Sequence, residues 1–211
     1  MTGDPNLREP VQRAINFISQ AKNDDSAWRY TPRCGDNDTS VTGWQVFALK
    51  SACVSGLEVK REDFADASKW LDNMTVLDTG RVGYNKKGFG SPTITAVGIM
   101  CRMLLGWRND SPLLQKGSKI ILSDNSWCSE KEVNFYHIYQ ASLGMFQMGD
   151  PYWKTWHDKM TDFLLKNQVQ GSCEHGSWEP SKDQRCKNRV FTTALGALSL
   201  EVYYRYLPFA R

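Results

Sequence analysis

The stretch TSVTGWQVFALKSA, residues 39–52, is the first of four segments that begin with small, hydroxylated or aromatic residues and continue as an apolar run. The other three are TITAVGIMCRMLLG from Thr93, FYHIYQASLGMFQMG from Phe135 and TTALGALSLEVYYRY from Thr192, and successive segments start about 40 to 57 residues apart. Each is apolar on more than one face, which is typical of a helix buried on most sides. A regular spacing of this kind predicts a helical repeat.

More amphipathic segments separate these runs: REPVQRAINFISQAK from Arg8, REDFADASKWLDNM from Arg61, SPLLQKGSKIILS from Ser111 and PYWKTWHDKMTDFLLKNQ from Pro151. Helix ends are marked, for example by Asp38 before residue 39 and by Gly56 after the same run. No stretch alternates apolar and polar residues for long enough to make a strand. We therefore predict an all-α fold that repeats an inner helix, an outer helix and a Gly/Trp loop, as solenoids and closed rings do.

The composition is that of a single globular domain, which we assign to residues 1–211. This domain could be part of a longer chain. A net charge of +3, evenly spread, argues against a nucleic-acid partner. No apolar run is long enough to span a bilayer, and the first ten residues lack the apolar core of a secretion signal. We expect a soluble chain, with a periplasmic or secreted location if an upstream signal has been removed.

Six cysteines are present. Cys53 and Cys101 lie within apolar helical patterns, so we expect both to be buried thiols. The other four lie in predicted loops, where disulfides form in an oxidising compartment: Cys34, Cys128, Cys173 and Cys186. The last two flank one loop and are the first candidates for a bridge. No pair has the two-residue spacing of a zinc knuckle, so we expect no cysteine-based metal site.

Two turn-rich stretches have the same shape. QGSCEHGSWEP, residues 170–180, has Gln170 followed by Gly176 and Trp178. QAKNDDSAWRYTP has Gln20 followed by Ser26 and Trp28 at the same spacing. Two looser versions lie at residues 80–84 and 125–127. A planar aromatic ring can cover a tight turn, and an amide can satisfy the free backbone groups of a helix end. These loops are therefore predicted to be structural staples.

The pattern Q-x5-G-x-W resembles the QW repeat of the triterpene cyclases, the squalene–hopene cyclase family. The segments at residues 35–45 and 190–208 also resemble the prenyltransferase and squalene oxidase repeat proteins of bacteria. The resemblance covers almost the whole chain and implies an α/α toroid, a ring of six helical hairpins in that family. This chain has about four and a half hairpins. The resemblance thus implies a partial toroid, either an open crescent or part of a longer protein.

The resemblance also implies where cyclase chemistry would lie. The cyclases protonate an alkene with an aspartate of an Asp-x-Asp-Asp-Thr pattern, and the matching segment here is Gly-Asp-Asn-Asp-Thr at residues 35–39. Asn37 stands at the proton donor's position, and an amide cannot donate that proton. Asp36 could substitute for it. Alternatively, Asp36 and Asp38 cap the following helix and favour its positive end.

Protein prenyltransferases of related fold hold zinc through an aspartate, a cysteine two residues later and a distant histidine. Asp38 and Ser40 have that spacing, but serine replaces the thiolate. His137 lies in a segment that resembles the one carrying the family's histidine, yet it is two repeats away from Asp38. We therefore expect neither a metal nor a cofactor.

A third possibility is carbohydrate chemistry at the rim between the third and fourth inner helices. Some polysaccharide lyases on α/α toroids abstract a proton with histidine or tyrosine. The start of one predicted inner helix carries Asn134, Tyr136, His137 and Tyr139. The loop before the next one carries Glu174, His175, Glu179, Arg185 and Arg189. This group could bind an acidic sugar, or the aromatics could be core residues beneath a solvated charged rim.

Two functional hypotheses follow. The first is a non-catalytic or degenerate module whose concave, aromatic-rich face, including Trp44, binds an apolar small molecule or a protein segment. The second is an enzyme, lyase-like or acting on a prenyl substrate, with His137 and Tyr136 or Tyr139 as acid–base groups. In either case we consider Arg185, Arg189, Glu174 and His175 as ligand-binding candidates, and Asp38 and Asp36 as further catalytic candidates.

Overall fold

The computed structural model describes residues 4–24, 26–129, 132–171, 173–181 and 187–205, and these are mostly helical, which confirms the all-α prediction. A 3₁₀ turn, η1 (Pro5–Leu7), leads into the first of the eight α-helices found in these described ranges. The helices are α1 (Arg8–Ala21), α2 (Thr39–Val54), α3 (Arg61–Met74), α4 (Pro92–Leu104), α5 (Pro112–Ser123), α6 (Phe135–Met148), α7 (Tyr152–Lys166) and α8 (Arg189–Arg205). Strands β1 (Cys128–Ser129) and β2 (Glu132–Val133) pair antiparallel, with Cys128 opposite Val133. Two residues per strand are too few for an alternating pattern to be read.

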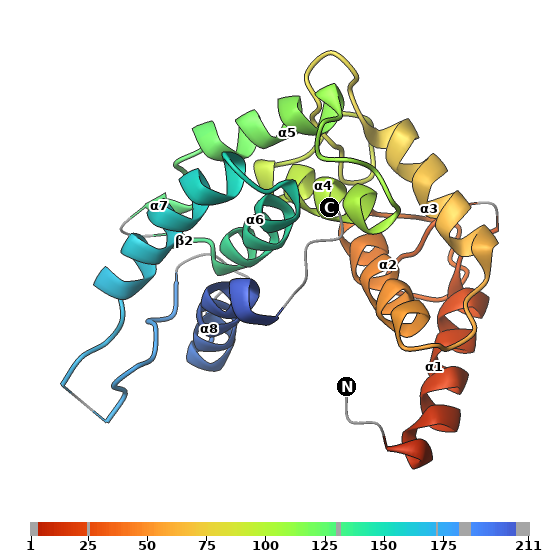
Figure 1. Cartoon of the computed structure of the whole chain (residues 1–211), viewed down its shortest axis with the longest axis horizontal. Helices are drawn as coiled ribbons and strands as arrows, with labels where there is room; N and C mark the ends of the chain where they lie inside the picture. Colours follow the sequence, from red (N-terminus) through yellow and green to blue (C-terminus); the bar gives the residue numbers. More distant parts are fainter. Residues whose placement is uncertain (1–3, 25, 130–131, 172, 182–186, 206–211) are drawn as a thin grey trace.

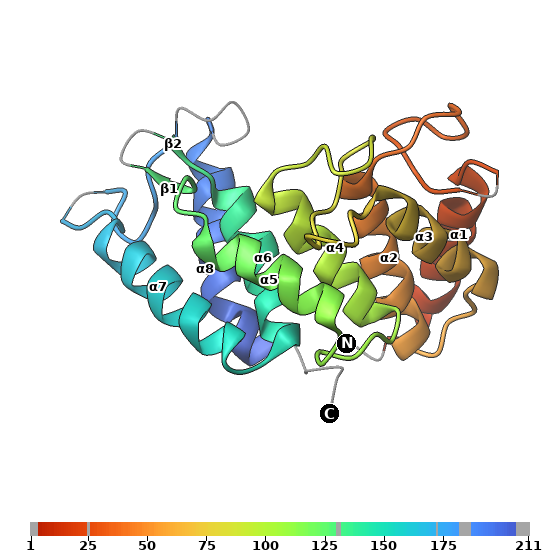
Figure 2. The ribbon, with the colours of Figure 1, turned by 90° about the horizontal axis from the view of Figure 1, so that it is seen from above.

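The helices alternate between two curved rows. In Figure 1, α2, α4, α6 and α8 form the inner row and α1, α3, α5 and α7 form the outer row, so that the molecule is an open arc. The closest packing between helices joins α4 to α6, then α6 to α8 and α2 to α4. Figure 2 shows the long loops that precede the inner helices along one edge of the arc. The short connections from each inner helix to the next outer one lie along the opposite edge.

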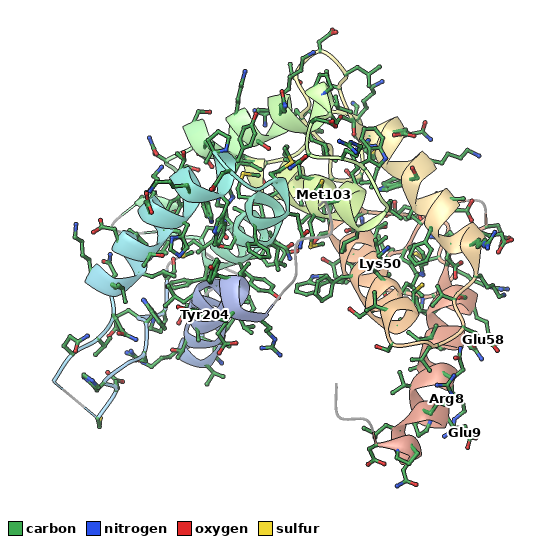
Figure 3. All side chains as sticks on the ribbon, viewed as in Figure 1. Arg8, Glu9, Lys50, Glu58, Met103 and Tyr204 are labelled. Carbon is green, nitrogen blue, oxygen red and sulfur yellow. The ribbon has the colours of Figure 1, made fainter. Side chains whose placement is uncertain are left out.

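Burial depends on a helix's place in the inner row. In α4 every residue after Pro92 is buried, and in α6 every residue except Tyr136 is buried. Helices α2 and α8 end the row, and each buries only part of its surface. Figure 3 shows Met103 near the crown of the arc, where it is 1% exposed, and Tyr204 on α8, where it is 86% exposed. The apolar character predicted from sequence is thus used fully only where an inner helix has two inner neighbours.

Tryptophan side chains tie the long loops to the helices on both sides. The indole N–H of Trp28 donates to the carbonyl of Ile18 at 2.8 Å, and that of Trp178 donates to the carbonyl of Leu164 at 2.9 Å. Both carbonyls belong to the last turns of outer helices, where backbone acceptors are otherwise free. The backbone N–H groups of the same tryptophans donate to threonine hydroxyls of the next inner helix, at 3.3 and 3.2 Å. Each tryptophan therefore joins an outer helix to the inner helix that follows it.

The amides that brace these loops are not the glutamines of the repeat pattern. Asn23 donates to the carbonyl of Asp36 at 2.7 Å, and Gln168 donates to the carbonyl of Gly176 at 2.9 Å. Gln20 and Gln170 are exposed. Gln20 is still within α1, on its solvent side, whereas Asn23 is buried just beyond the helix end. The amide that holds each loop is therefore the one located at the turn, Asn23 in the first loop and Gln168 in the second.

The cysteines divide differently from the sequence prediction. Cys101 is buried as expected, but Cys53 is exposed because it lies one residue beyond Ala52, at the edge of the buried stripe of α2. Cys34 and Cys173 are exposed as well. The proposed pairing of Cys173 with Cys186 cannot be placed, since Cys186 lies outside the described residues.

Alkaline pH is expected to destabilise the fold through Cys101. Burial raises the pKa of this thiol from about 9 to about 12, although the charge of Arg102 acts in the opposite direction. Above pH 9 the unfolded chain releases a proton that the folded chain keeps, so stability falls as pH rises. Between pH 9 and 10.5 this loss is about 2 kcal/mol. Urea unfolding of the unmodified protein and of Cys101→Ala at both pH values measures this loss. An equal decrease in the free energy of unfolding between the two pH values in both proteins would contradict the expectation.

Candidate functional site

A cavity of about 970 Å³ opens at the edge of the arc that carries the long loops. The first turns of all four inner helices line it, together with Tyr30 and the loop at residues 75–91. Six lining side chains are aromatic: Tyr30, Trp44, Tyr84, Phe89, Tyr136 and Phe191. Small-molecule sites in proteins have volumes in this range and are lined mainly by apolar and aromatic side chains. The cavity is therefore the leading candidate for a binding site.

Tyr136 and Trp44 form the wall where α6 meets α2. The hydroxyl groups of Tyr136 and Ser40 are hydrogen-bonded at 2.7 Å. Trp44 stacks on Tyr139, with ring centroids 6.1 Å apart, and it is tilted against Tyr136 at 6.5 Å. Burial raises the pKa of Tyr136, and its hydrogen bond with Ser40 only partly offsets this. The phenol therefore stays protonated at neutral pH, and it can donate or accept a hydrogen bond but does not act as a base.

Asp38 holds this region together from behind the cavity wall. It is fully buried, and its Oδ1 accepts the backbone N–H of Val41 at 2.7 Å, which caps α2. Its Oδ2 accepts the hydroxyl of Tyr84 at 3.0 Å and lies 3.5 Å from Arg29. Burial, with the neighbouring Tyr30 and Asp38, raises the pKa of Tyr84. Both oxygens of Asp38 are thus engaged, and it borders the cavity only through Tyr84.

Asp36 and Asn37 lie apart from the cavity. Asp36 is largely exposed, at 61%, and pairs with Arg29 at 3.3 Å, so of the two aspartates only Asp38 caps α2. The side chain of Asn37 bonds within the loop, accepting from Asn23 at 2.8 Å and donating to Ser26 at 3.0 Å. The segment that resembles the cyclase acid pattern therefore supports the loop before α2 and does not line the cavity.

The loop at residues 75–91 is a fixed wall. A Cβ added to Gly83 would lie 1.9 Å from the carbonyl oxygen of Lys86, so only glycine permits this turn. The loop is anchored to the start of α2 because the backbone N–H of Thr39 donates to the carbonyl of Tyr84 at 2.8 Å. The Thr39 hydroxyl donates to the carbonyl of Gly83 at 2.6 Å. Sequence analysis missed the lining side chains of this loop, although its glycine content was a signal of a constrained turn.

His137 does not belong to the cavity. It is 1% exposed, and its Nδ1 lies 3.0 Å from the hydroxyl of Thr93. Its ring stacks on Trp127 at 6.2 Å and meets the edge of Trp156 at 5.7 Å. Successive helical residues point about 100° apart, so Tyr136 faces the cavity while His137 faces the core. A core position removes His137 from contact with any ligand in the cavity, and we do not retain it as an acid–base group.

The other grouped residues of the predicted rim also have structural partners. Asn134 caps α6 by accepting the backbone N–H of His137 at 2.8 Å. Arg189 pairs with Glu179 at 2.6 Å and with Glu174 at 3.2 Å. His175 accepts the backbone N–H of Gly171 at 3.3 Å, and Tyr139 is buried behind Trp44. Arg185 lies outside the described residues. The structure brings none of the described members of this group to the cavity lining, where α8 contributes Phe191.

No family model and no curated protein matches this chain. Its chemistry must therefore be inferred from the cavity itself. No three His, Cys, Asp or Glu side chains of the described residues lie together in a way that could hold a metal ion. None of the described helices has both the length and the apolar character needed to cross a membrane.

Proposed function

We propose that this protein is a non-catalytic module that binds an apolar small molecule in the aromatic cavity, on a partial α/α toroid related to the terpenoid cyclases and prenyltransferases. The two curved rows of helices and the resemblance of the loop pattern support the toroid. The observation that carries the function is the lining itself. Six aromatic side chains converge on one cavity, and no carboxylate, histidine or cysteine is among the lining residues described.

Three hydroxyl groups of the cavity wall already have hydrogen-bond partners. Ser40 bonds to Tyr136, and Tyr84 bonds to Asp38. Such groups orient the walls and leave apolar contact as the main source of affinity. A ligand that buries about 300 Å² of apolar surface gains roughly 7 kcal/mol. The loss of translational and rotational freedom takes at least about 4 kcal/mol of this, so we expect dissociation constants of roughly millimolar or weaker.

The enzyme hypotheses have no comparable support. The acid–base role of His137 would require it to reach a substrate, yet it lies in the core between two tryptophans. Asp38 is bound on both oxygens by the start of α2, Tyr84 and Arg29. Arg189, which would have bound an acidic sugar, is paired with two glutamates.

Replacement of Trp44 by alanine is expected to weaken binding of a neutral apolar probe, N-phenylnaphthylamine, by about tenfold, because an aromatic contact of this kind is worth roughly 1.5 kcal/mol. Fluorescence titration measures the affinity. Trp153→Ala is the matched control, since Trp153 packs on Phe146 and His157, away from the cavity. Absence of saturable binding by the unmodified protein, or equal weakening by both variants, would contradict the proposed function.

A further inference from the structure

Arg81 is a cation that lines the aromatic cavity, and no acidic partner for it is found among the described residues. Its guanidinium donates one hydrogen bond, to the carbonyl of Gly90 at 2.9 Å. A guanidinium has five N–H donors, so most of its donor capacity is not used by the described residues. Three other buried or half-buried arginines are paired, Arg29 with Asp38, Arg102 with Asp72 and Arg189 with Glu179, whereas Arg8 and Arg33, which like Arg81 donate to backbone carbonyls, do not line the cavity. Arg81 forms no ion pair with any carboxylate in the described part of the chain.

The remainder of the lining does not neutralise this charge. The cavity has no acidic lining residue among those described. The nearest buried carboxylate noted above, Asp38, lies behind Tyr84 and is matched by Arg29. The N-terminal end of α4 also borders the cavity, through its N-cap Ser91 and through Ile94 of its first turn, and the N-terminal end of a helix carries partial positive charge. A positive group in an open cavity with mainly apolar walls favours an anion there.

We infer that the ligand is an amphipathic acid, with an apolar body against the aromatic wall and a carboxylate paired with Arg81. The inference rests on the proposed function because it concerns the same cavity. A guanidinium matches a carboxylate in a planar, two-bond geometry. A diphosphate carries more negative charge and is normally held by several cations or by a metal, whereas Arg81 is the single cationic side chain among the described lining residues. One cation therefore selects a singly charged head group.

The test compares two fluorescent probes that share a ring system, anilinonaphthalene sulfonate with an anionic group and N-phenylnaphthylamine without one. Arg81→Met is expected to weaken binding of the anionic probe about tenfold to a hundredfold, the effect of losing a charge-assisted hydrogen bond. Binding of the neutral probe should change less than about twofold, since methionine keeps apolar contact. Lys87→Met is the control, because Lys87 is exposed on the same loop and does not line the cavity.

Competition identifies the head group. Decanoate is expected to displace the anionic probe from the unmodified protein more strongly than decanol does, and this advantage should disappear in Arg81→Met. Stronger displacement by decyl phosphate than by decanoate would overturn the assignment to a carboxylate. Binding of the neutral probe with no dependence of the anionic probe on Arg81 would overturn the inference and leave the proposed function intact. Failure of both probes to bind would refute the proposed function itself.

Because the bond from Arg81 to Gly90 also braces the loop, Arg81→Met could disturb the fold. Arg81→Lys keeps the charge and is expected to retain more affinity for the anionic probe than Arg81→Met does. For the unmodified protein, added salt should weaken the anionic probe and leave the neutral probe nearly unchanged. If added salt changed the affinity of neither probe, this result would contradict the proposed ion pair with Arg81. The salt test uses only the unmodified protein, so it does not depend on the stability of the variants.

Discussion

Trp127→Ala is expected to lower the free energy of unfolding by about 3–5 kcal/mol, the cost typical of deleting a buried aromatic side chain. Trp127 is 1% exposed and lies before β1, in the loop between α5 and α6. Its ring contacts Trp156 at 5.1 Å, Phe163 at 5.3 Å and His137 at 6.2 Å between centroids. Alanine would leave a cavity among three rings that belong to α6 and α7, and close packing there cannot relax without moving a helix.

Trp127 also satisfies polar groups that alanine cannot. Its indole N–H donates to the carbonyl of Asp124 at 3.1 Å, and the ammonium group of Lys159 lies 5.2 Å from its ring centroid. Urea unfolding monitored by circular dichroism measures the loss. Trp44→Ala is the control, because Trp44 is 40% exposed and should cost about 1 kcal/mol. Equal losses in the two variants would show that Trp127 is not a staple of the fold.

Asp38→Ala is expected to cost about 2–4 kcal/mol. Loss of a helix cap accounts for about 1 kcal/mol. The remainder comes from leaving the hydroxyl of Tyr84 without its acceptor, since an unsatisfied buried donor costs about 1–3 kcal/mol, and from leaving Arg29 with only Asp36 as its carboxylate partner. Asp38→Asn keeps an oxygen that can accept the N–H of Val41, and its amide N–H can donate to the hydroxyl of Tyr84, but the charge opposite Arg29 is lost. The cost of Asp38→Asn should therefore be smaller. Thermal and urea unfolding of both variants measure the difference.

The control for Asp38 is its neighbour Asp36. Asp36 is exposed and pairs with Arg29 at the surface, so Asp36→Ala should cost less than about 1 kcal/mol. Asp38→Ala should also weaken binding of the neutral probe, because the hydroxyl of Tyr84 would lose its anchor. If Asp38→Ala were as stable as Asp36→Ala, the capping role of Asp38 would have to be abandoned.

Sequence patterns predicted the secondary structure well because local physics decides it. The four apolar runs and the four amphipathic ones became the inner and outer rows of helices, since apolar periodicity sets which faces must be covered. Asp38 was named as a cap from its place before an apolar run, and it caps α2. The prediction that Cys53 is buried was wrong, because successive side chains of α2 point in different directions and the one after Ala52 faces solvent.

The candidate site was only partly predictable. Trp44 and Tyr136 were named from sequence and line the cavity, but His137 was grouped with Tyr136 and lies in the core. Two residues that are adjacent on a helix point in different directions. Which of them faces the cavity depends on where the neighbouring helices lie. Arg81 and Phe89 were missed. The glycines of their loop indicate that the chain turns there, but they do not indicate which side chains face the cavity.

By itself, the sequence determined that the chain is helical, where its helices lie to within about three residues, and that tryptophans lie at the turns, because these depend on residues close together in the chain. Only the tertiary structure decided which side chains meet at the cavity. Tyr30, Phe89 and Phe191 come together across more than 160 residues because two rows of helices curve and bring the first turns of the inner helices to one edge. That curvature arises from packing among all the helices, which no local pattern specifies.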